Sequence, residues 1–397
     1  MQMNYRKKTY RSAAAITVAA MILGGCAARE EYTGGHVTEE APQISAEQAK
    51  LNMIQTSAYN NVNGLNLEQD SYISILGRSG EGAYWDQIRE GMDQAVEDLN
   101  TLLGYEGGDK IRATYNAPDR EDNVDDQVSI LDEELDRYPL AVGIAIADVS
   151  ACEVQFDLAT ENGIPVVAFD SGSDYQGLMA TVQTDNDGSA REAADHMAEQ
   201  MGETGQVLIL VDNSKAKAQT TRESAFRDQM ATGHTGITVA GTCYLDQMEE
   251  AAEAAEEAAD TEETAAADGE TEELDPVQEI LSQYPDVTGI FAVSSNAVSF
   301  GLELTEAMAD ASEETGAETE NQLVFVGYDA EEEEIEALSE GTISGLIVQN
   351  PYGMGYATVV AAARAALGQG NEAVVNTGYQ WVTAENLETE EIQRILY

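Results

Sequence analysis

Short apolar segments alternate with amphipathic segments along most of this chain, and this pattern constrains its fold more than any other feature. The first apolar segment, 72–76, predicts a buried strand, and apolar side chains between Ile88 and Leu99 then recur three and four residues apart, which predicts a helix. The same reasoning predicts strands at 111–115, 142–147, 166–169, 207–211, 237–244, 289–293, 323–328 and 343–348, and helices through 124–135, 188–201, 222–230 and 352–367. Alternation of this kind predicts parallel sheets that are covered by helices on both faces.

An internal echo accompanies the alternation. Residues 135–144 and 281–290 share Leu, Tyr-Pro and Gly-Ile at identical spacing, and each predicts the end of a helix, a tight turn and the start of a buried strand. The echo is either a coincidence between two similar connections or the mark of two lobes of one architecture related by a pseudo-twofold axis. A length of 397 residues is sufficient for two domains.

The N-terminus has the pattern of an export signal. Four basic residues precede an apolar run over 13–23, which is too short to span a membrane as a mature helix. The run ends in Leu23-Gly24-Gly25-Cys26, which resembles the bacterial lipoprotein signal. This resemblance implies a signal peptide at 1–25 and a diacylglycerol, with palmitate-type acylation, on Cys26. The alternative is an ordinary signal peptide with an incidental cysteine.

Two further segments depart from the strand and helix pattern. Residues 26–70 are polar and rich in Asn, Gly, Thr and Gln, which predicts a tether between membrane and folded body. Residues 249–275 hold 13 acidic residues and no basic one, and we expect a flexible or weakly helical surface insertion there because like charges at helical spacing repel. The insertion lacks the ordered ligand spacing of a calcium loop.

Charge and cysteine content exclude several classes of function. A formal net charge of −55 excludes nucleic acid as a partner, because its phosphates would be repelled. Apart from Cys26, only Cys152 and Cys243 remain, too few for a disulfide framework or a zinc site, and we expect both to be small core residues. The three histidines, His36, His196 and His234, form no recognisable catalytic set, so we expect neither an enzyme nor a metal or cofactor site.

Polar and aromatic residues follow several of the predicted strands. Ligands of open parallel sheets bind at the carboxyl ends of the strands. Tyr84 and Trp85 lie in the segment after the first strand, where their rings could stack on a sugar; core packing is the alternative. The nearby glycines do not follow the dinucleotide-binding order. Candidate polar ligand residues, each near a strand end or opening a helix, are Asp170, Arg222, Asp329 and Gln349.

These motifs together resemble the type I periplasmic binding proteins of the ribose/galactose-binding group. The resemblance covers about residues 71–397. It is carried by Tyr84-Trp85 with Gly91, by Gly163-Ile164-Pro165-Val166 leading to Asp170, by Asp185-Asn186 with Gly188, by Arg222-x-x-Ala225-Phe226 with Ala in place of Gly, by Val326-Gly327-Tyr328-Asp329, and by Ile347-Val348-Gln349-Asn350-Pro351. Singly these motifs are weak, and in this order and spacing they are strong.

The resemblance implies an α/β fold of two Rossmann-like lobes joined by a three-strand hinge. Lobe 1 would comprise 71–184 with 350–378, and lobe 2 would comprise 185–349 with 379–397. Tyr84 and Trp85 would stack on the ligand, while Asp170, Arg222, Asp329 and Gln349 would form hydrogen bonds with it. Ser294 and Asn296 are both candidates for the usual Asn after the strand at 289–293. Ser171, also a candidate, stands where ribose binders carry Arg, which argues against assuming ribose.

The implied function is capture of a small sugar outside the cytoplasm. We expect a lipid-anchored monomer on the outer face of the cell membrane that delivers a neutral sugar to the permease subunits of an ABC importer. A sensor that presents the same ligand to a membrane receptor or kinase is the alternative. A cationic ligand is the minor alternative to a neutral one, since carboxylates and aromatic rings could also hold an amine.

Overall fold

Two six-stranded sheets form the body of the protein. The computed structural model describes residues 44–261, 275–315 and 323–397. The first sheet has the order β11-β5-β4-β3-β1-β2 and is parallel throughout. Its strands are β1 (Tyr72–Leu76), β2 (Arg112–Asn116), β3 (Ala141–Ile144), β4 (Val166–Phe169), β5 (Thr181–Gln183) and β11 (Val374–Asn376).

The second sheet repeats this order as β12-β10-β9-β8-β6-β7. Its strands are β6 (Gly205–Val211), β7 (Ile237–Tyr244), β8 (Gly289–Ala292), β9 (Val324–Tyr328), β10 (Gly345–Gln349) and β12 (Tyr379–Val382). Only β12 departs from the first sheet, because it pairs with β10 in the antiparallel sense. The sequence echo precedes β3 in one sheet and β8 in the other, and these strands occupy the same place in the order. The two lobes therefore share one architecture.

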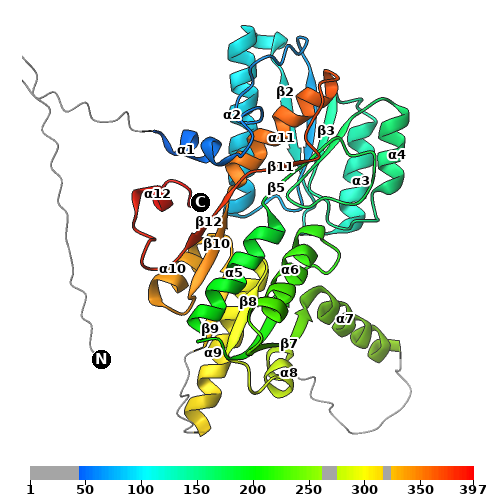
Figure 1. Cartoon of the computed structure of the whole chain (residues 1–397). Helices are drawn as coiled ribbons and strands as arrows, with labels where there is room; N and C mark the ends of the chain where they lie inside the picture. The colour runs from blue at the N-terminus through cyan, green and yellow to red at the C-terminus, as the bar shows by residue number, and fades with distance from the viewer. Residues whose placement is uncertain (1–43, 262–274, 316–322) are drawn as a thin grey trace, which may run out of the picture. The chain divides into compact units, whose positions relative to one another are not determined.

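Helices surround each sheet (Figure 1). Those of lobe 1 are α1 (Ala46–Met53), α2 (Ala83–Leu103), the short 3-10 helix η1 (Gly107–Asp109), α3 (Val124–Leu135), α4 (Glu153–Glu161) and α11 (Pro351–Ala366). Those of lobe 2 are α5 (Asn186–Gln200), α6 (Lys217–Gly233), α7 (Leu245–Thr261), α8 (Pro276–Gln283), α9 (Ser295–Thr315), α10 (Glu332–Glu340) and α12 (Glu390–Gln393).

Helix α11 completes lobe 1 although it follows lobe 2 in the chain. It packs along α2 and against β3, β4 and β5. The two helices approach closely through two glycines: a Cβ at Gly91 would lie 1.9 Å from the Tyr352 carbonyl oxygen, and one at Gly355 would lie 2.0 Å from that of Ile88. Larger residues at either position would force the helices apart.

The chain crosses between the lobes three times. It leaves the first sheet after β5 and enters α5 of lobe 2, returns after β10 into α11, and crosses again between β11 and β12. Neither lobe is thus a continuous stretch of sequence. Three short crossings are the connection expected of a hinge.

The predicted tether is wrong for residues 44–70. This segment forms α1 and then packs its apolar side chains into the lobe 1 core, namely Leu51, Ile54, Tyr59, Val62, Leu65 and Leu67. These side chains are spaced irregularly among Asn and Gly, so they lack the periodicity by which a sequence indicates burial. The predicted signal peptide, Cys26 and the rest of the tether lie outside the described residues. Within the described part of the chain, none of the helices combines the length and apolar character needed to cross a membrane.

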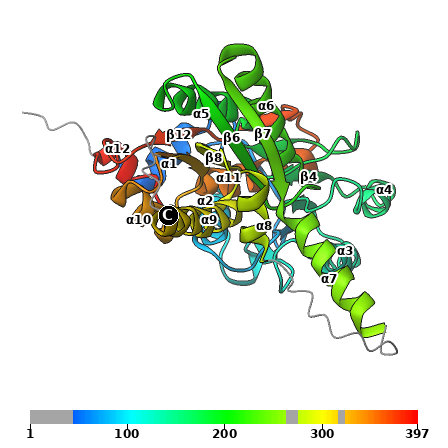
Figure 2. The same ribbon diagram turned by 90° about the horizontal axis from the view of Figure 1, so that it is seen from below.

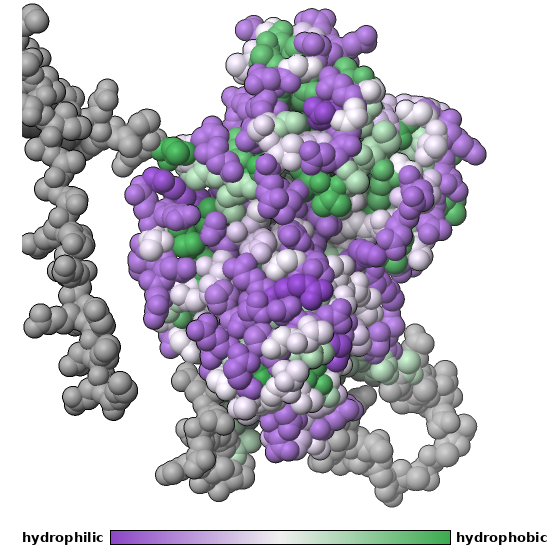
Figure 3. Space-filling view, viewed as in Figure 1, coloured by the Kyte–Doolittle hydropathy of each residue, from purple (hydrophilic) through white to green (hydrophobic). Residues whose placement is uncertain are grey.

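The acidic insertion begins as a regular helix. Helix α7 extends away from the end of β7 and includes residues 249–261 of the insertion, while 262–274 lie outside the described residues (Figures 1 and 2). Alanine, the best helix former, is interleaved with the acids, and its propensity outweighs like-charge repulsion of a few tenths of a kcal/mol per pair. The face of the protein shown in Figure 3 is mainly hydrophilic, with small scattered apolar patches.

Cys152 and Cys243 are free and buried, as expected of small core residues. Burial raises the pKa of the Cys152 thiol to about 12 and that of the Cys243 thiol to about 11. Both thiols therefore stay protonated and unreactive at neutral pH.

Candidate ligand-binding site

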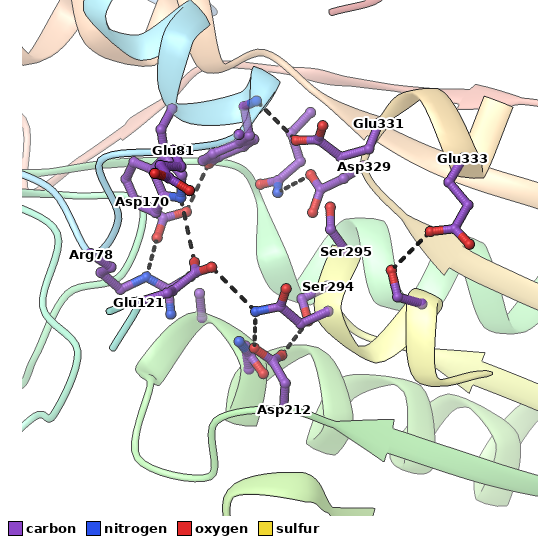
Figure 4. A pocket seen from close by; sticks show the side chains of 18 of the residues that line it. Arg78, Glu81, Glu121, Asp170, Asp212, Ser294, Ser295, Asp329, Glu331 and Glu333 are labelled. Carbon is purple, nitrogen blue, oxygen red and sulfur yellow. Dashed lines mark hydrogen bonds and ion pairs between the residues drawn. The ribbon is translucent and has the colours of Figure 1, made fainter. Parts of the chain in front are cut away.

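A cavity of about 560 Å³ lies between the lobes, at the carboxyl ends of strands from both sheets (Figure 4). Lobe 1 contributes the segments after β1, β2 and β4, and lobe 2 contributes those after β6, β8, β9 and β10 together with α6. The volume falls in the range of small-molecule sites. Both sheets thus direct their strand ends toward one cleft.

Asp170 and Asp329 occupy equivalent positions in the two lobes. Each directly follows a strand, β4 or β9, and each has a left-handed backbone, with φ of 56° and 80°. Residues other than glycine rarely adopt this conformation, and those that do are found disproportionately at functional sites. Both side chains are nearly fully buried in the cavity wall. Each lobe therefore uses a sharp turn after its fourth strand to aim a carboxylate into the cleft.

Partners inside the protein hold both carboxylates in place. Asp170 Oδ1 accepts a hydrogen bond from the Tyr84 hydroxyl at 2.8 Å. Asp329 Oδ1 accepts from Gln349 Nε2 at 2.7 Å and from the Tyr397 hydroxyl at 2.9 Å. Burial raises the pKa of Asp329, against the opposing effect of Arg222.

Arg78, just after β1, forms the main ion pairs of lobe 1. Its Nη1 lies 3.2 Å from Asp122 Oδ2 and its Nε lies 3.2 Å from Asp170 Oδ2. Burial by itself would lower the pKa of Arg78, but the surrounding carboxylates, Asp122 first, outweigh it and raise that pKa. The guanidinium is therefore a permanent charge beside Asp170.

Arg222 of α6 is held by neutral partners. It donates to Asn186 Oδ1 at 2.8 Å, to the Val293 carbonyl at 2.7 Å and to Gln349 Oε1 at 2.8 Å. The guanidinium carbon also lies 4.2 Å from the centre of the Tyr328 ring. These contacts come from α5, β9, β10 and the connection after β8 and fix the guanidinium plane, so its remaining N–H groups can donate in a defined direction.

Tyr84 and Trp85 form an aromatic pair at the start of α2. Their ring centres are 5.2 Å apart and the planes are nearly perpendicular, at 83°. Burial raises the pKa of the Tyr84 hydroxyl well above its ordinary value, with Asp170 adding to the effect. Tyr84 therefore remains a donor to Asp170, and the pair supplies an apolar portion of an otherwise polar wall.

Eight of the nine ligand residues predicted from sequence line this cavity. They are Tyr84, Trp85, Asp170, Arg222, Ser294, Asn296, Asp329 and Gln349. Ser171 does not line it: its fully buried hydroxyl accepts a hydrogen bond from the Ala218 backbone N–H at 3.3 Å. Because the chain turns sharply at Asp170, the next side chain points at α6 of lobe 2 and not into the cavity.

Sequence reasoning missed eight charged residues of the wall, among them Arg78, Glu121, Asp212 and Glu331. Asp212 directly follows β6, and Arg78 follows β1 by two residues, so the rule that found Asp170 could have found both. Glu121 and Glu331 lie in longer connections. In a chain with 74 acidic residues nothing local distinguishes these two.

Several contacts close the lobes over the cavity. Asn213 Nδ2 donates to Asp122 Oδ2 at 2.7 Å, and Glu331 of lobe 2 accepts from the backbone N–H groups of Ala83 and Tyr84 at 3.3 and 3.1 Å. Among the described residues, no group of His, Cys, Asp and Glu is arranged to hold a metal ion. The site is thus a polar cleft suited to an organic ligand.

Two lobes of equivalent topology, three crossings and a cavity at the facing strand ends define a two-lobed α/β binding protein. A family model described as periplasmic binding protein domain matches residues 73–370. The chain belongs to this family, in the type I form of the ribose/galactose-binding group.

Known relatives agree with this assignment. The ribose import binding protein RbsB of Haemophilus influenzae is 21% identical over 235 residues, 59% of this chain, and the match spans only 65% of that protein's length. A carbohydrate transporter solute binding protein of Agrobacterium radiobacter, solved with D-arabinose, is 25% identical with a TM-score of 0.63, covering 83% of this chain and 99% of its own. An ABC transporter solute binding protein of Agrobacterium vitis, bound with α-D-tagatopyranose, is 22% identical with a TM-score of 0.64, covering 82% and 99%. These relatives are binding proteins of transport systems and not enzymes, in agreement with the expectation from sequence.

Proposed function

We propose that this protein captures a small sugar between its lobes and delivers it to the membrane-spanning subunits of an ABC importer. The observation that carries the proposal is the convergence of Asp170, Asp329 and Arg222 from both lobes on one cleft. Carboxylates accept hydrogen bonds from neighbouring hydroxyls, and a guanidinium donates to ring and hydroxyl oxygens. Tyr84 and Trp85 add an apolar surface for the C–H groups of a sugar ring.

Capture in this arrangement requires hinge closure. Ligand groups would bridge residues of both lobes, so the ligand binds the closed form better and shifts the equilibrium toward it. Gln349 lies at the crossing between β10 and α11 and contacts both Arg222 and Asp329. The hinge and the ligand site are therefore directly connected.

The same proposal includes the location of the protein. The N-terminal sequence and the family support a place outside the cytoplasm, with Cys26 as the lipid attachment point and the folded body acting as a monomer. The bound sugars in the related structures support a sugar as the ligand here.

A thermal-shift screen against monosaccharides tests the ligand class. A ligand present at 100 times its Kd, and binding only the folded state, stabilises a protein by about 2.7 kcal/mol, which raises Tm measurably. Absence of any shift at millimolar sugar would contradict sugar capture. Cells that lack the protein should then take up the identified sugar more slowly, and unchanged uptake with a lost transcriptional response would favour the sensor role.

A further inference from the structure

The wall of the cavity is much more acidic than the chain as a whole. Of its 21 lining residues, nine are Asp or Glu and two are Arg. In the full sequence 74 of 397 residues are acidic. Four of the nine, Glu81, Glu332, Glu333 and Glu336, are exposed and belong to the acidic surface, while the other five are buried or half-buried. The acidic residues of the wall suggest that the ligand carries a positive charge. This inference rests on the proposed function, because it assumes that the ligand is a sugar bound in this cavity.

The two arginines are already committed to particular carboxylates. Arg78 pairs with Asp122 and Asp170. Arg222 reaches Asp329 indirectly, since Gln349 accepts from Arg222 and donates to Asp329. Arg78 also acts electrostatically on Glu121 and Asp212, but it forms no ion pair with either carboxylate.

Glu121 of lobe 1 and Asp212 of lobe 2 approach each other across the cleft, with Asn296 between them (Figure 4). One nitrogen, Nδ2 of Asn296, donates to Glu121 Oε2 at 3.3 Å and to Asp212 Oδ2 at 3.4 Å. The other partners are also neutral: Trp85 Nε1 donates to Glu121 at 3.4 Å, and the Ser294 hydroxyl donates to Asp212. Within the described ranges no Lys, Arg or His nitrogen lies within 4.0 Å of either carboxylate. Closure thus brings two carboxylates together that share only the long hydrogen bonds of Asn296 and have no ion-pair partner among the residues that the structure describes.

Burial and charge crowding reinforce each other here. Burial raises the pKa of Glu121, and the nearby Asp212 carboxylate adds to that rise against the opposing effect of Arg78. A positive group placed between these carboxylates would favour the ionised form of both. Because the carboxylates belong to different lobes, the same group would also stabilise closure.

A buried, unused donor lies in the same wall. Gln219 of α6 lines the cavity and is 1% exposed. Its Oε1 accepts a hydrogen bond from the Asn213 backbone N–H at 3.1 Å, whereas its Nε2 has no hydrogen-bond partner among the described residues. An unsatisfied buried donor is costly unless a ligand completes it. Gln219 is held by Asn213, the residue after Asp212, so the wall that carries Asp212 also offers a free donor for a ligand oxygen.

We propose that the ligand is an amino sugar, whose ammonium group lies between Glu121 and Asp212 while a neighbouring oxygen accepts from Gln219. The hydroxyls of the ring would face Asp170, Arg222 and Asp329. An ammonium suits the position better than a metal ion, because the described residues offer no metal-holding group of ligands. This assignment replaces the neutral sugar expected from the sequence.

Matched ligands test the charge directly. Calorimetry and thermal shift would compare D-glucosamine, D-galactosamine and D-mannosamine with the parent hexoses and with the uncharged N-acetyl derivatives. At least one amine should bind tenfold or more tightly than its parent, and its N-acetyl form should lose this advantage. A neutral hexose that binds as well as or better than its amine overturns this inference and leaves sugar capture standing. If no member of any series binds, this inference fails, and the wider monosaccharide screen decides whether sugar capture stands.

Isosteric variants test the position. Glu121→Gln and Asp212→Asn should each weaken binding of the amine about tenfold, which is about 1.4 kcal/mol, and change binding of the neutral parent by less than about threefold. Glu133→Gln and Asp286→Asn remove one charge at exposed positions outside the cavity and serve as controls. Equal losses for amine and parent, with Tm of the free variants unchanged, would show that these carboxylates bind no ammonium.

Discussion

Glu331 links the two lobes through the first turns of two helices. It is the N-cap of α10, where it forms a capping box with Glu334, and its side chain also accepts from Ala83 and Tyr84 in the first turn of α2. The N-cap of α2 is Gly82, which has no side chain to satisfy these N–H groups. Glu331 therefore supplies the missing cap of α2, and it can do so only when the lobes are closed.

The free energy by which Glu331 favours the closed form can be estimated from these contacts. A side-chain N-cap is worth about 1 kcal/mol, and a negative charge at a helix N-terminus adds about 0.3–1 kcal/mol. The bridge should thus favour the closed form by roughly 1–2 kcal/mol, which is about 5–30-fold in the ratio of closed to open protein.

Two variants separate the bridge from the cap of α10. Glu331→Asp keeps the charge and a favoured N-cap residue for α10, but it withdraws the carboxylate by about one bond length, roughly 1.5 Å, so that it no longer reaches α2. We expect a larger radius of gyration without ligand in solution scattering, and a ligand Kd weakened by up to about 30-fold. Glu331→Ala should show the same opening and, because α10 also loses its cap, a lower Tm.

A control substitution elsewhere on α10 separates loss of the bridge from a general effect of shortening Glu to Asp. Glu340→Asp makes the same chemical change at the exposed end of α10 and should alter neither quantity. If Glu331→Asp scatters like the wild type without ligand and binds with the same Kd, the bridge does not hold the lobes together.

The remaining predictions concern affinity, pH, the lipid anchor and the acidic insertion. Arg222→Ala and Asp170→Ala should each weaken ligand binding by about 2 kcal/mol or more in calorimetry, because each leaves buried partners unpaired; wild-type affinity would place the site elsewhere. Burial raises the pKa of Asp122 to about 6, so the folded state holds the carboxyl proton more tightly than the unfolded state does. Protonation of Asp122 therefore stabilises the fold by no more than about 3 kcal/mol. This stabilisation is present near pH 4 and is lost as the pH rises through 6. Urea unfolding at pH 5 and 7.5 should show this loss in the wild type and a flatter profile in Asp122→Asn; equal pH profiles would refute it. Cys26→Ser should abolish lipid labelling, and labelling that persists would refute the anchor. Replacing 249–275 by a short Gly/Ser linker should leave affinity within about tenfold, and a greater loss would implicate this segment in binding or closure.

The alternation of strands and helices was predictable because its causes are local. Apolar runs and the three-to-four spacing are properties of ten to twenty consecutive residues, and they located most strands to within two or three positions. The short strands β5, β11 and β12 were not predicted as strands, since three or four residues carry no usable pattern and only pairing with distant neighbours defines them. The packing of 44–70 was missed for the same reason.

The candidate site was predictable where one rule applied. Asp170 and Asp329 follow buried strands, and parallel sheets bring strand ends together. Glu121 and Glu331 acquire their roles only when the lobes close, because each contacts the opposite lobe. Ser171 was misplaced because the left-handed turn at Asp170 changes the direction of the next side chain. Side-chain direction at a sharp turn depends on backbone angles that residue types alone do not specify.

The late position of α11 in the chain has a consequence for folding during synthesis. Strands β1 to β5 are made before residue 184, but the helix that covers β3, β4 and β5 ends at residue 366, and the edge strand β11 comes later still. At synthesis rates of roughly 5–20 residues per second, α11 is completed on the order of 10–40 s after β5, and the apolar face of the sheet stays exposed during this time. Uncovered apolar faces and open strand edges are where non-native association begins. The lobe that is synthesised first is therefore the last to be completed, and the nascent chain needs protection until α11 has emerged.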